Sequence, residues 1–332
     1  MLASPLPLFA GNSASSIPQG YVEITIPAGD PSAPSVATFS IPTNLIPSPD
    51  FVGKASGFID SVTQNTIFSD KAEWEAGALS LPSAPYFVRI TSGAATGLTF
   101  QISTTEANTS STLTVLTQGL DLTKLGIAGG DTYKIFPGDT LASFFGTSTQ
   151  GGTSAATADN VNIFTDGVWR VFYYHSTSGQ WREGSLPINR NNMVLRPDWG
   201  ITFYRRGDTP LRYVLLGETP STDVKIVVNN HGPTYIGGVF PVDETLGTSG
   251  LESSPLWVKS GDSGEASTLN VWDGSVWRNY NYSASSGQWR EGSLPVNRNN
   301  VLLPAGTPLI VNLWGDNEGV SILNRTLPYS LD

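Results

Sequence analysis

The chain contains no cysteine among its 332 residues. Disulfide bonds, thiol nucleophiles, cysteine-ligated zinc and iron–sulfur clusters are therefore excluded. Charge is also scarce, because Asp, Glu, Lys and Arg together make up only 14% of the chain, well below the usual quarter. The net charge is −10 and the sequence holds no cluster of Lys or Arg. A nucleic acid or an anionic membrane surface would therefore find no basic face to bind.

Long apolar runs and catalytic motifs are also missing from the sequence. No segment approaches the roughly 18 apolar residues of a membrane-spanning helix. Only two histidines occur, and no GxSxG, HExxH or P-loop pattern is present. Gly261–Glu265 (GDSGE) is similar to the surroundings of a trypsin-like serine, but that family's other motifs are missing, so we interpret it as a turn. The chain is predicted not to be an enzyme.

Acidic residues leave two minor alternatives. A hydrolase that uses a pair of carboxylates, such as Glu183 with Glu291, is a remote possibility because such pairs carry no local motif. The oxygen-rich segments Pro241–Gly247 and Gly315–Gly319 contain the ligand types that Ca²⁺ prefers but lack EF-hand spacing. No cofactor and no metal site is predicted.

The N-terminal sequence, MLASPLPLFAGNSASS, is apolar for ten residues and then small and polar. It lacks the basic first region of a signal peptide, so no intact signal peptide is recognised in this sequence. We interpret residues 1–19 as an extended arm, with Leu6, Leu8 and Phe9 as candidate assembly residues. Such an arm can add a strand to the sheet edge of a neighbouring molecule.

The residues that are abundant favour strands. The 35 glycines and 23 prolines, with many Ser and Thr, are typical of short strands joined by turns. Nine Trp, 11 Tyr and 14 Phe are enough to fill a sizeable core. Residues 20–26 alternate between polar and apolar side chains, as a half-buried strand does. Residues 51–137 contain five or six short strands at even turn spacing, which indicates a small barrel or sandwich.

A repeat organises the rest of the chain. The segment Ser178–Asn192, SGQWREGSLPINRNN, returns 108 residues later as Ser286–Asn300, and only Ile188 against Val296 differs. Weaker similarity continues on both sides of the two copies. We predict an all-β protein with an N-terminal barrel or sandwich module, residues 20–139, followed by two tandem repeated β-domains, residues 140–235 and 236–332.

Each copy of the repeat is predicted to form a strand, a turn and a return strand. One interpretation is a clamp that folds this hairpin, through stacking of Arg on Trp, pairing of Glu with Arg and Asn side chains that cap the strand ends. The alternative is a duplicated contact site for a sugar or a neighbouring subunit, which requires exposed rings. The candidate binding residues are Trp169, Tyr174, Trp181 and Arg182 in the first copy and Trp277, Tyr282, Trp289 and Arg290 in the second.

Several segments occur in a specific order: GYVEITIPAG, FVGKASGFIDSVTQNTI, YFVRITSGAATGLTFQI and GDTYKIFPGDTLASFF, followed by the paired DGVWR and GSVWR hairpins. This order resembles a family of exported β-rich proteins of verrucomicrobial bacteria, which occurs as many paralogues and has no assigned function. The segment VRITSGAATGLTFQI is also similar to β-modules of phage tail and fibre proteins. The resemblance implies export to the cell surface or the extracellular space, and it implies no catalytic residue.

These observations lead to one expected function with an alternative. We expect a secreted structural protein whose partner is itself, and which assembles into an extracellular filament or surface layer, with the N-terminal arm as one contact. The alternative is a secreted protein that binds an extracellular polysaccharide through the paired Trp and Tyr faces of the two hairpins.

Overall fold

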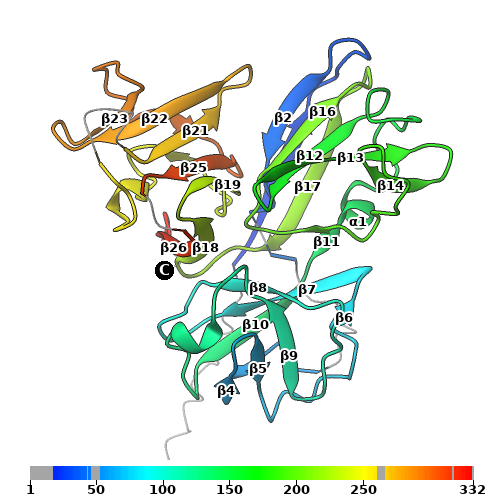
Figure 1. The fold of residues 1–332 in the computed structure, drawn as a ribbon, viewed down its shortest axis with the longest axis vertical. Coiled ribbons are helices and arrows are strands. Elements are labelled where there is room, and N and C mark those ends of the chain that lie inside the picture. Colours follow the sequence, from blue (N-terminus) through cyan, green and yellow to red (C-terminus); the bar gives the residue numbers. More distant parts are fainter. Residues whose placement is uncertain (1–17, 43, 46–52, 260–265, 316–317, 331–332) are drawn as a thin grey trace, which may run out of the picture.

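The computed structural model describes residues 18–42, 44–45, 53–259, 266–315 and 318–330. These residues form an all-β protein with three units of antiparallel sheet, one short α-helix and two 3-10 helices (Figure 1). We call the units the module, repeat 1 and repeat 2. No helix in the described residues is long and apolar enough to cross a membrane.

The module is one curled sheet built from residues 56–137, with the strand order β3-β10-β7-β8-β9-β5-β4 and with β6 paired to β7. Its core contains the buried aromatic residues Trp74, Phe100 and Tyr133. Its elements are β3 (Ser56–Phe58), β4 (Ser61–Val62), β5 (Thr66–Phe68), β6 (Ser80–Leu81), β7 (Ala84–Ile90), β8 (Thr99–Ile102), β9 (Thr112–Leu116), the 3-10 helix η1 (Leu122–Lys124) and β10 (Thr132–Pro137).

Repeat 1 combines residues from both sides of the module. A five-stranded sheet, β14-β13-β12-β16-β2, is accompanied by the strand pairs β1-β17 and β11-β15. Its elements are β1 (Gln19–Ile26), β2 (Ser35–Phe39), β11 (Asp139–Thr140), α1 (Leu141–Phe145), β12 (Asn160–Thr165), β13 (Val168–His175), β14 (Gln180–Glu183), β15 (Val194–Leu195), β16 (Ile201–Arg205) and β17 (Leu211–Glu218).

Repeat 2 has the same arrangement without an insertion. Its five-stranded sheet, β19-β25-β21-β22-β23, is accompanied by the pairs β18-β26 and β20-β24. Its elements are β18 (Val224–Asn229), β19 (Gly232–Ile236), β20 (Glu244–Thr245), the 3-10 helix η2 (Leu251–Ser253), β21 (Thr268–Trp272), β22 (Trp277–Ser283), β23 (Gln288–Glu291), β24 (Leu302–Leu303), β25 (Leu309–Leu313) and β26 (Val320–Arg325).

The strand pairing divides the chain differently from the predicted boundaries. Strands β1 and β2 pair with β17 and β16, so the beginning of the chain belongs to repeat 1 and the module is inserted between β2 and β11. Strands β18 and β19 pair with β26 and β25, so residues 224–236 belong to repeat 2. The first two strands of each repeat lie outside the closely repeated segment, and their similarity is limited to the Val-x-Ile of Val22–Ile24 and Val224–Ile226, which is why the repeat in the sequence does not mark them.

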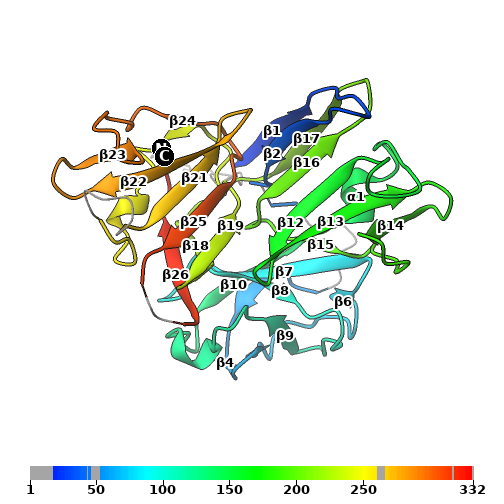
Figure 2. The same ribbon diagram turned by 45° about the horizontal axis from the view of Figure 1, so that its top comes forward.

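The two repeats stand side by side above the module. Their edge strands β2 and β19 lie toward the middle, and the hairpins β13–β14 and β22–β23 lie at opposite ends (Figures 1 and 2). Backbone hydrogen bonds join repeat 1 to repeat 2, including Gly237 N–H to Asp198 O at 2.8 Å. Repeat 2 also meets the module, where Lys225 N–H donates to Gly97 O at 3.1 Å and Ile322 packs against the module core.

Candidate functional site

The two repeated hairpins have the same local geometry. A tight turn ends in a left-handed glycine in each, Gly179 at φ 65° and Gly287 at φ 64°, and its N–H donates to the last residue of the outgoing strand. A residue with a β-carbon is disfavoured in this conformation. The register then places Trp181 opposite Tyr174 and Trp289 opposite Tyr282.

The structure overturns the hypothesis that the return-strand tryptophans form a sugar platform. Trp181 is 1% exposed and Trp289 is fully buried. The ring of Trp181 lies 5.5 Å from that of Phe145, and the ring of Trp289 lies 5.4 Å from that of Trp257. Both tryptophans are core residues. Successive side chains of a strand point to opposite faces of the sheet, so each tryptophan faces the core while the residues next to it face outward.

The predicted stacking of Arg182 on Trp181 and of Arg290 on Trp289 is also wrong. Residues next to each other in a strand point to opposite faces of the sheet, so the arginine lies on the outer face while the tryptophan lies in the core. Tyr174 and Tyr282 are partly buried and pack against the cores of their own repeats.

The ion pairs and asparagine bonds of the predicted clamp are present. Arg170 donates to both oxygens of Glu183 at 2.7 and 2.6 Å, and Arg190 lies 2.9 Å from the same carboxylate. In repeat 1 Asn191 Oδ1 accepts from the N–H of Trp181 at 2.8 Å.

Repeat 2 reproduces the clamp with small differences. Glu291 pairs with Arg298 at 2.8 Å and with Arg278 at 3.4 Å, and Asn299 Oδ1 accepts from the N–H of Trp289 at 2.8 Å. Arg278 additionally donates to Asp273 at 2.7 Å. The retained Arg, Glu and Asn residues therefore hold the loop that follows the hairpin against the buried tryptophan.

We expect the clamp of repeat 1 to weaken in acid. The hydrogen bonds and positive charge of Arg170, and the charge of Arg190, lower the pKa of Glu183 below its ordinary value of 4.5. A lowered folded-state pKa adds stability above the unfolded pKa, and this stability is lost as the pH falls through the folded pKa. Glu183→Gln should destabilise the protein at pH 7 by about 1–3 kcal/mol, and the difference from the wild type should shrink below pH 4.5.

Denaturant unfolding curves measured from pH 7 to pH 3 would check this prediction. Glu106→Gln, a change at an exposed turn residue of the module, is the control and should follow the wild type throughout. A Glu183→Gln deficit that is constant across this pH range would contradict the assigned role of the carboxylate.

The clamp carries an exposed apolar tip that sequence reasoning missed. Leu186 and Ile188 are 46% and 47% exposed, and their equivalents Leu294 and Val296 are 50% and 49% exposed. Both pairs belong to the repeated segment and lie in the loops after β14 and β23. We call residues 185–188 and 293–296 the apolar tips. The signal in the sequence was the retention of two apolar residues within a polar repeat.

Two of the candidate binding residues, Trp169 and Trp277, lie next to the same aromatic ring, that of Tyr235. The ring of Tyr235 lies 5.2 Å from that of Trp169 and 5.8 Å from that of Trp277. Trp169 is 45% exposed, so these two equivalent tryptophans belong to the boundary between the repeats and not to a core.

The residues weighed for catalysis or metal binding are engaged in ordinary contacts. His175 Nδ1 lies 3.0 Å from Ser178 Oγ in its own turn. Glu244 pairs with the buried Arg325 at 2.8 Å, and Asp243 accepts from the N–H of Ala305. In the described residues no three His, Asp or Glu side chains are grouped to hold a metal ion.

Three of the predicted features lie wholly or partly outside the described residues: the arm residues Leu6, Leu8 and Phe9, the whole segment Gly261–Glu265, and residues 316–317 of Gly315–Gly319. Comparison of the chain with protein-family models, with curated proteins and with solved structures finds no match. Functional inference therefore depends on the geometry of the chain itself.

Proposed function

We propose that this chain is a secreted, non-enzymatic structural protein that assembles into a filament or surface layer through its two apolar tips. The observation that carries the proposal is the position of the tips. The same exposed pair is mounted on the same clamp at opposite ends of the paired repeats (Figures 1 and 2). A folding clamp explains the retained Arg, Glu and Asn residues, but it gives no reason to retain two exposed aliphatic side chains twice.

The occupant of each tip in this proposal is the tip of a second copy. Two nearly identical surfaces can meet in a self-complementary contact, and a molecule with one such surface at each end propagates the contact in an open array. The exposed leucine and its aliphatic neighbour supply the apolar centre, and the charged clamp residues nearby supply a polar rim, as in protein interfaces.

A second exposed face supports lateral association of such rows. Strands β1 and β17 pair Tyr21 with Leu216 and Glu23 with Val214, and the three apolar side chains of this face are 60–70% exposed. In repeat 2 the equivalent ribbon, β18–β26, is covered, because Ile322 packs against the core of the module. The open face in repeat 1 is therefore available to a second copy, which would extend a row into a layer.

The assembly proposal predicts a graded response to loss of the tips. Leu186→Ser with Ile188→Ser removes one tip and should stop growth at dimers. Adding Leu294→Ser and Val296→Ser removes both tips and should abolish the end-to-end filaments and lower the mass toward that of the 35.3 kDa monomer. Electron microscopy for filaments and light scattering for mass would measure the three states.

The matched control is Phe58→Ser with Leu81→Ser, a pair of exposed apolar residues of the module, which should assemble like the wild type. A wild-type protein that stays monomeric at high concentration would overturn the proposal, and so would unchanged filaments in the variant lacking both tips.

The N-terminal arm is a separate proposed contact. If Leu6, Leu8 and Phe9 dock on a neighbouring molecule, deletion of residues 1–16 should shorten or abolish the assemblies without altering the melting temperature. Unchanged assemblies after the deletion would remove the arm from the mechanism and leave the tips.

A further inference from the structure

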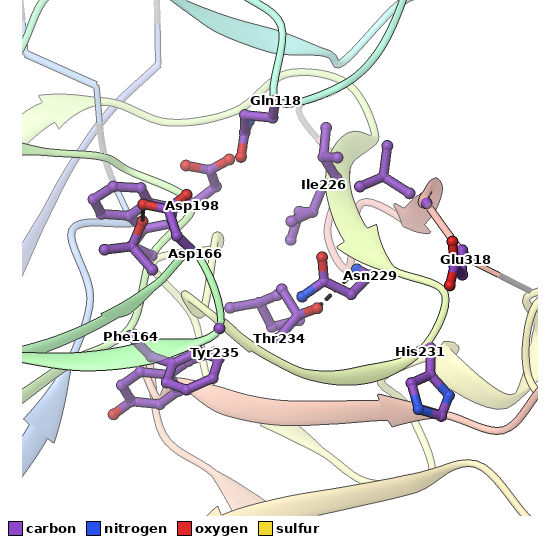
Figure 3. A pocket seen from close by; sticks show the side chains of 17 residues that line it. Gln118, Phe164, Asp166, Asp198, Ile226, Asn229, His231, Thr234, Tyr235 and Glu318 are labelled. Atoms are coloured by element: carbon purple, nitrogen blue, oxygen red, sulfur yellow. Dashed lines mark hydrogen bonds between the residues drawn. The ribbon is translucent and has the colours of Figure 1, made fainter.

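A cleft of about 620 Å³ lies where the three units meet (Figure 3). The module contributes Gln118, repeat 1 contributes residues 164–167 and 198–199, and repeat 2 contributes residues of β18 and β19 and residues 318–320. Three aromatic side chains belong to its walls: Phe164, Trp199 and Tyr235. A concave, partly aromatic site between units, with a few polar groups, is the usual form of a small-molecule site.

Gln118 adopts a backbone conformation that its residue type disfavours. It occupies the first central position of the turn Thr117–Leu120, where Leu120 N–H donates to Thr117 O at 3.1 Å and both Gln118 (φ 56°) and Gly119 (φ 91°) are left-handed. Such turns favour Asn, Asp or Gly at this position, because a β-carbon lies too close to the following carbonyl oxygen in this conformation, and only the short polar side chains of Asn and Asp compensate by local hydrogen bonds. The strain persists only where the surroundings or a function require the side chain.

The side chain of Gln118 has a second unusual feature. Its Nε2 is buried and has no hydrogen-bond partner among the described residues. Figure 3 shows the side chain extending from its turn into the cleft, on the side of Asp198. A buried donor without an acceptor is unfavourable, and a bound molecule with an acceptor oxygen would remove this penalty.

The buried charges around the cleft are neutralised by the protein itself. Asp198 accepts two hydrogen bonds of 2.9 Å from Arg196. Arg170 and Arg190, which line an adjoining cleft, both bind Glu183. A charged ligand would disturb these pairs, whereas a neutral ligand with hydroxyl groups can use the remaining acceptor and donor capacity of the same side chains.

The adjoining cleft extends the site along the boundary between the module and repeat 1. It has a volume of about 380 Å³ and shares Thr165, Asp166 and Trp199 with the first cleft. Its other polar residues include Gln101 of the module and Asn189 and Asn192 of the repeated segment. The two clefts share part of their lining, and we call them together the groove; amides, carboxylates and one tryptophan line it.

We propose that this groove binds a neutral oligosaccharide. Gln118 Nε2 donates to a sugar oxygen, the carboxylates of Asp166 and Asp198 accept from sugar hydroxyl groups, and the C–H face of one ring packs on Trp199. The two adjoining volumes, about 620 and 380 Å³, favour a chain of several sugars over a single one. This activity uses other residues than self-assembly does, so either proposal can fail without the other.

The test exploits the strained turn. Gln118→Gly removes the amide and relieves the left-handed backbone, so the variant should fold at least as stably as the wild type. Neutral hexasaccharides of glucose, xylose, mannose and N-acetylglucosamine, with different linkages, are the probes, and oligouronates of the same length are the charged comparison. Binding is measured by calorimetry and by the change in tryptophan fluorescence. At least one hexasaccharide should bind the wild type more tightly than its disaccharide, and Gln118→Gly should weaken that binding at least tenfold.

Glu73→Gly is the matched control, because Glu73 (φ 56°) is an exposed left-handed residue of the module that does not line the groove. It should bind like the wild type. The proposal is overturned if no hexasaccharide binds, if only charged sugars such as oligouronates bind, or if Gln118→Gly binds as tightly as the wild type while remaining folded.

Discussion

Asp159→Ser is expected to lower the free energy of unfolding by about 3–5 kcal/mol, because it leaves a buried guanidinium without its partner. Asp159 and Arg205 are 1% and 4% exposed, and their side chains form an ion pair. The carboxylate also accepts from the N–H of Gln150 at 2.7 Å and from the N–H of Arg206 at 2.6 Å.

Repeat 2 shows how the same site is built without charge. Ser267 stands where repeat 1 has Asp159, and its hydroxyl accepts from the N–H of Val258 at 3.1 Å and from the N–H of Trp314 at 3.0 Å. Leu313 stands where repeat 1 has Arg205. The two backbone bonds are therefore common to both repeats, while the ion pair is particular to repeat 1.

The neutral site in repeat 2 therefore shows which second substitution should restore the stability lost in Asp159→Ser. Asp159→Ser combined with Arg205→Leu copies the neutral site into repeat 1 and should recover most of the lost stability, because an apolar replacement of a buried ion pair is often neutral. Denaturant unfolding of the wild type, both single variants and the double variant gives the coupling energy. Additive losses in the double variant would show that the two side chains do not act as a pair.

Trp289→Ala is expected to destabilise repeat 2 by about 3–5 kcal/mol, and Trp181→Ala should do the same to repeat 1. Each indole is at the centre of a separate core, and truncation leaves a cavity that the surrounding strands cannot close. Trp314, which is 53% exposed, is the control, and Trp314→Ala should change stability by less than about 1 kcal/mol.

Hydrogen exchange measured by mass spectrometry would locate each effect. Faster exchange after Trp289→Ala should concentrate in β21–β23 and β25, whereas Trp181→Ala should act on β12–β14 and β16. An equal response of both repeats to either change would contradict the view that each repeat has a core of its own. If Trp289→Ala left the stability unchanged, the conclusion that this side chain is part of the core of repeat 2 would be wrong.

Much of the hairpin was predictable from sequence, because its interactions are local. Glu183 and Arg190 are seven residues apart, and Asn191 bonds to the backbone of Trp181 ten residues earlier. Spacing and residue type were enough to suggest these contacts. The side on which each tryptophan lies was not predictable in the same way, because alternation defines two faces of a strand but does not say which of them a second layer covers.

The cleft could not be predicted from the sequence, because the residues that line it come from distant parts of the chain. Gln118, Asp166 and Tyr235 are far apart along the chain and in three different units, and nothing in the local pattern of any one of them refers to the others. The turn at Gln118 shows in the sequence only as a Gln-Gly pair, whereas its left-handed backbone and its buried, unpartnered amide are known only from the structure.

The sequence by itself determined the all-β class, the duplication, and the ion pairs and asparagine bonds of the clamp, since strand alternation, turn residues and short-range ion pairs are encoded within a few residues of each other. Only the tertiary structure decided that strands β1 and β2 complete repeat 1 around an inserted module, that Trp181 and Trp289 lie in cores, and that the apolar tips lie at opposite ends. The first of these outcomes depends on pairing between residues more than 100 positions apart, and all of them depend on the burial of apolar surface summed over whole units, which outweighs any local preference.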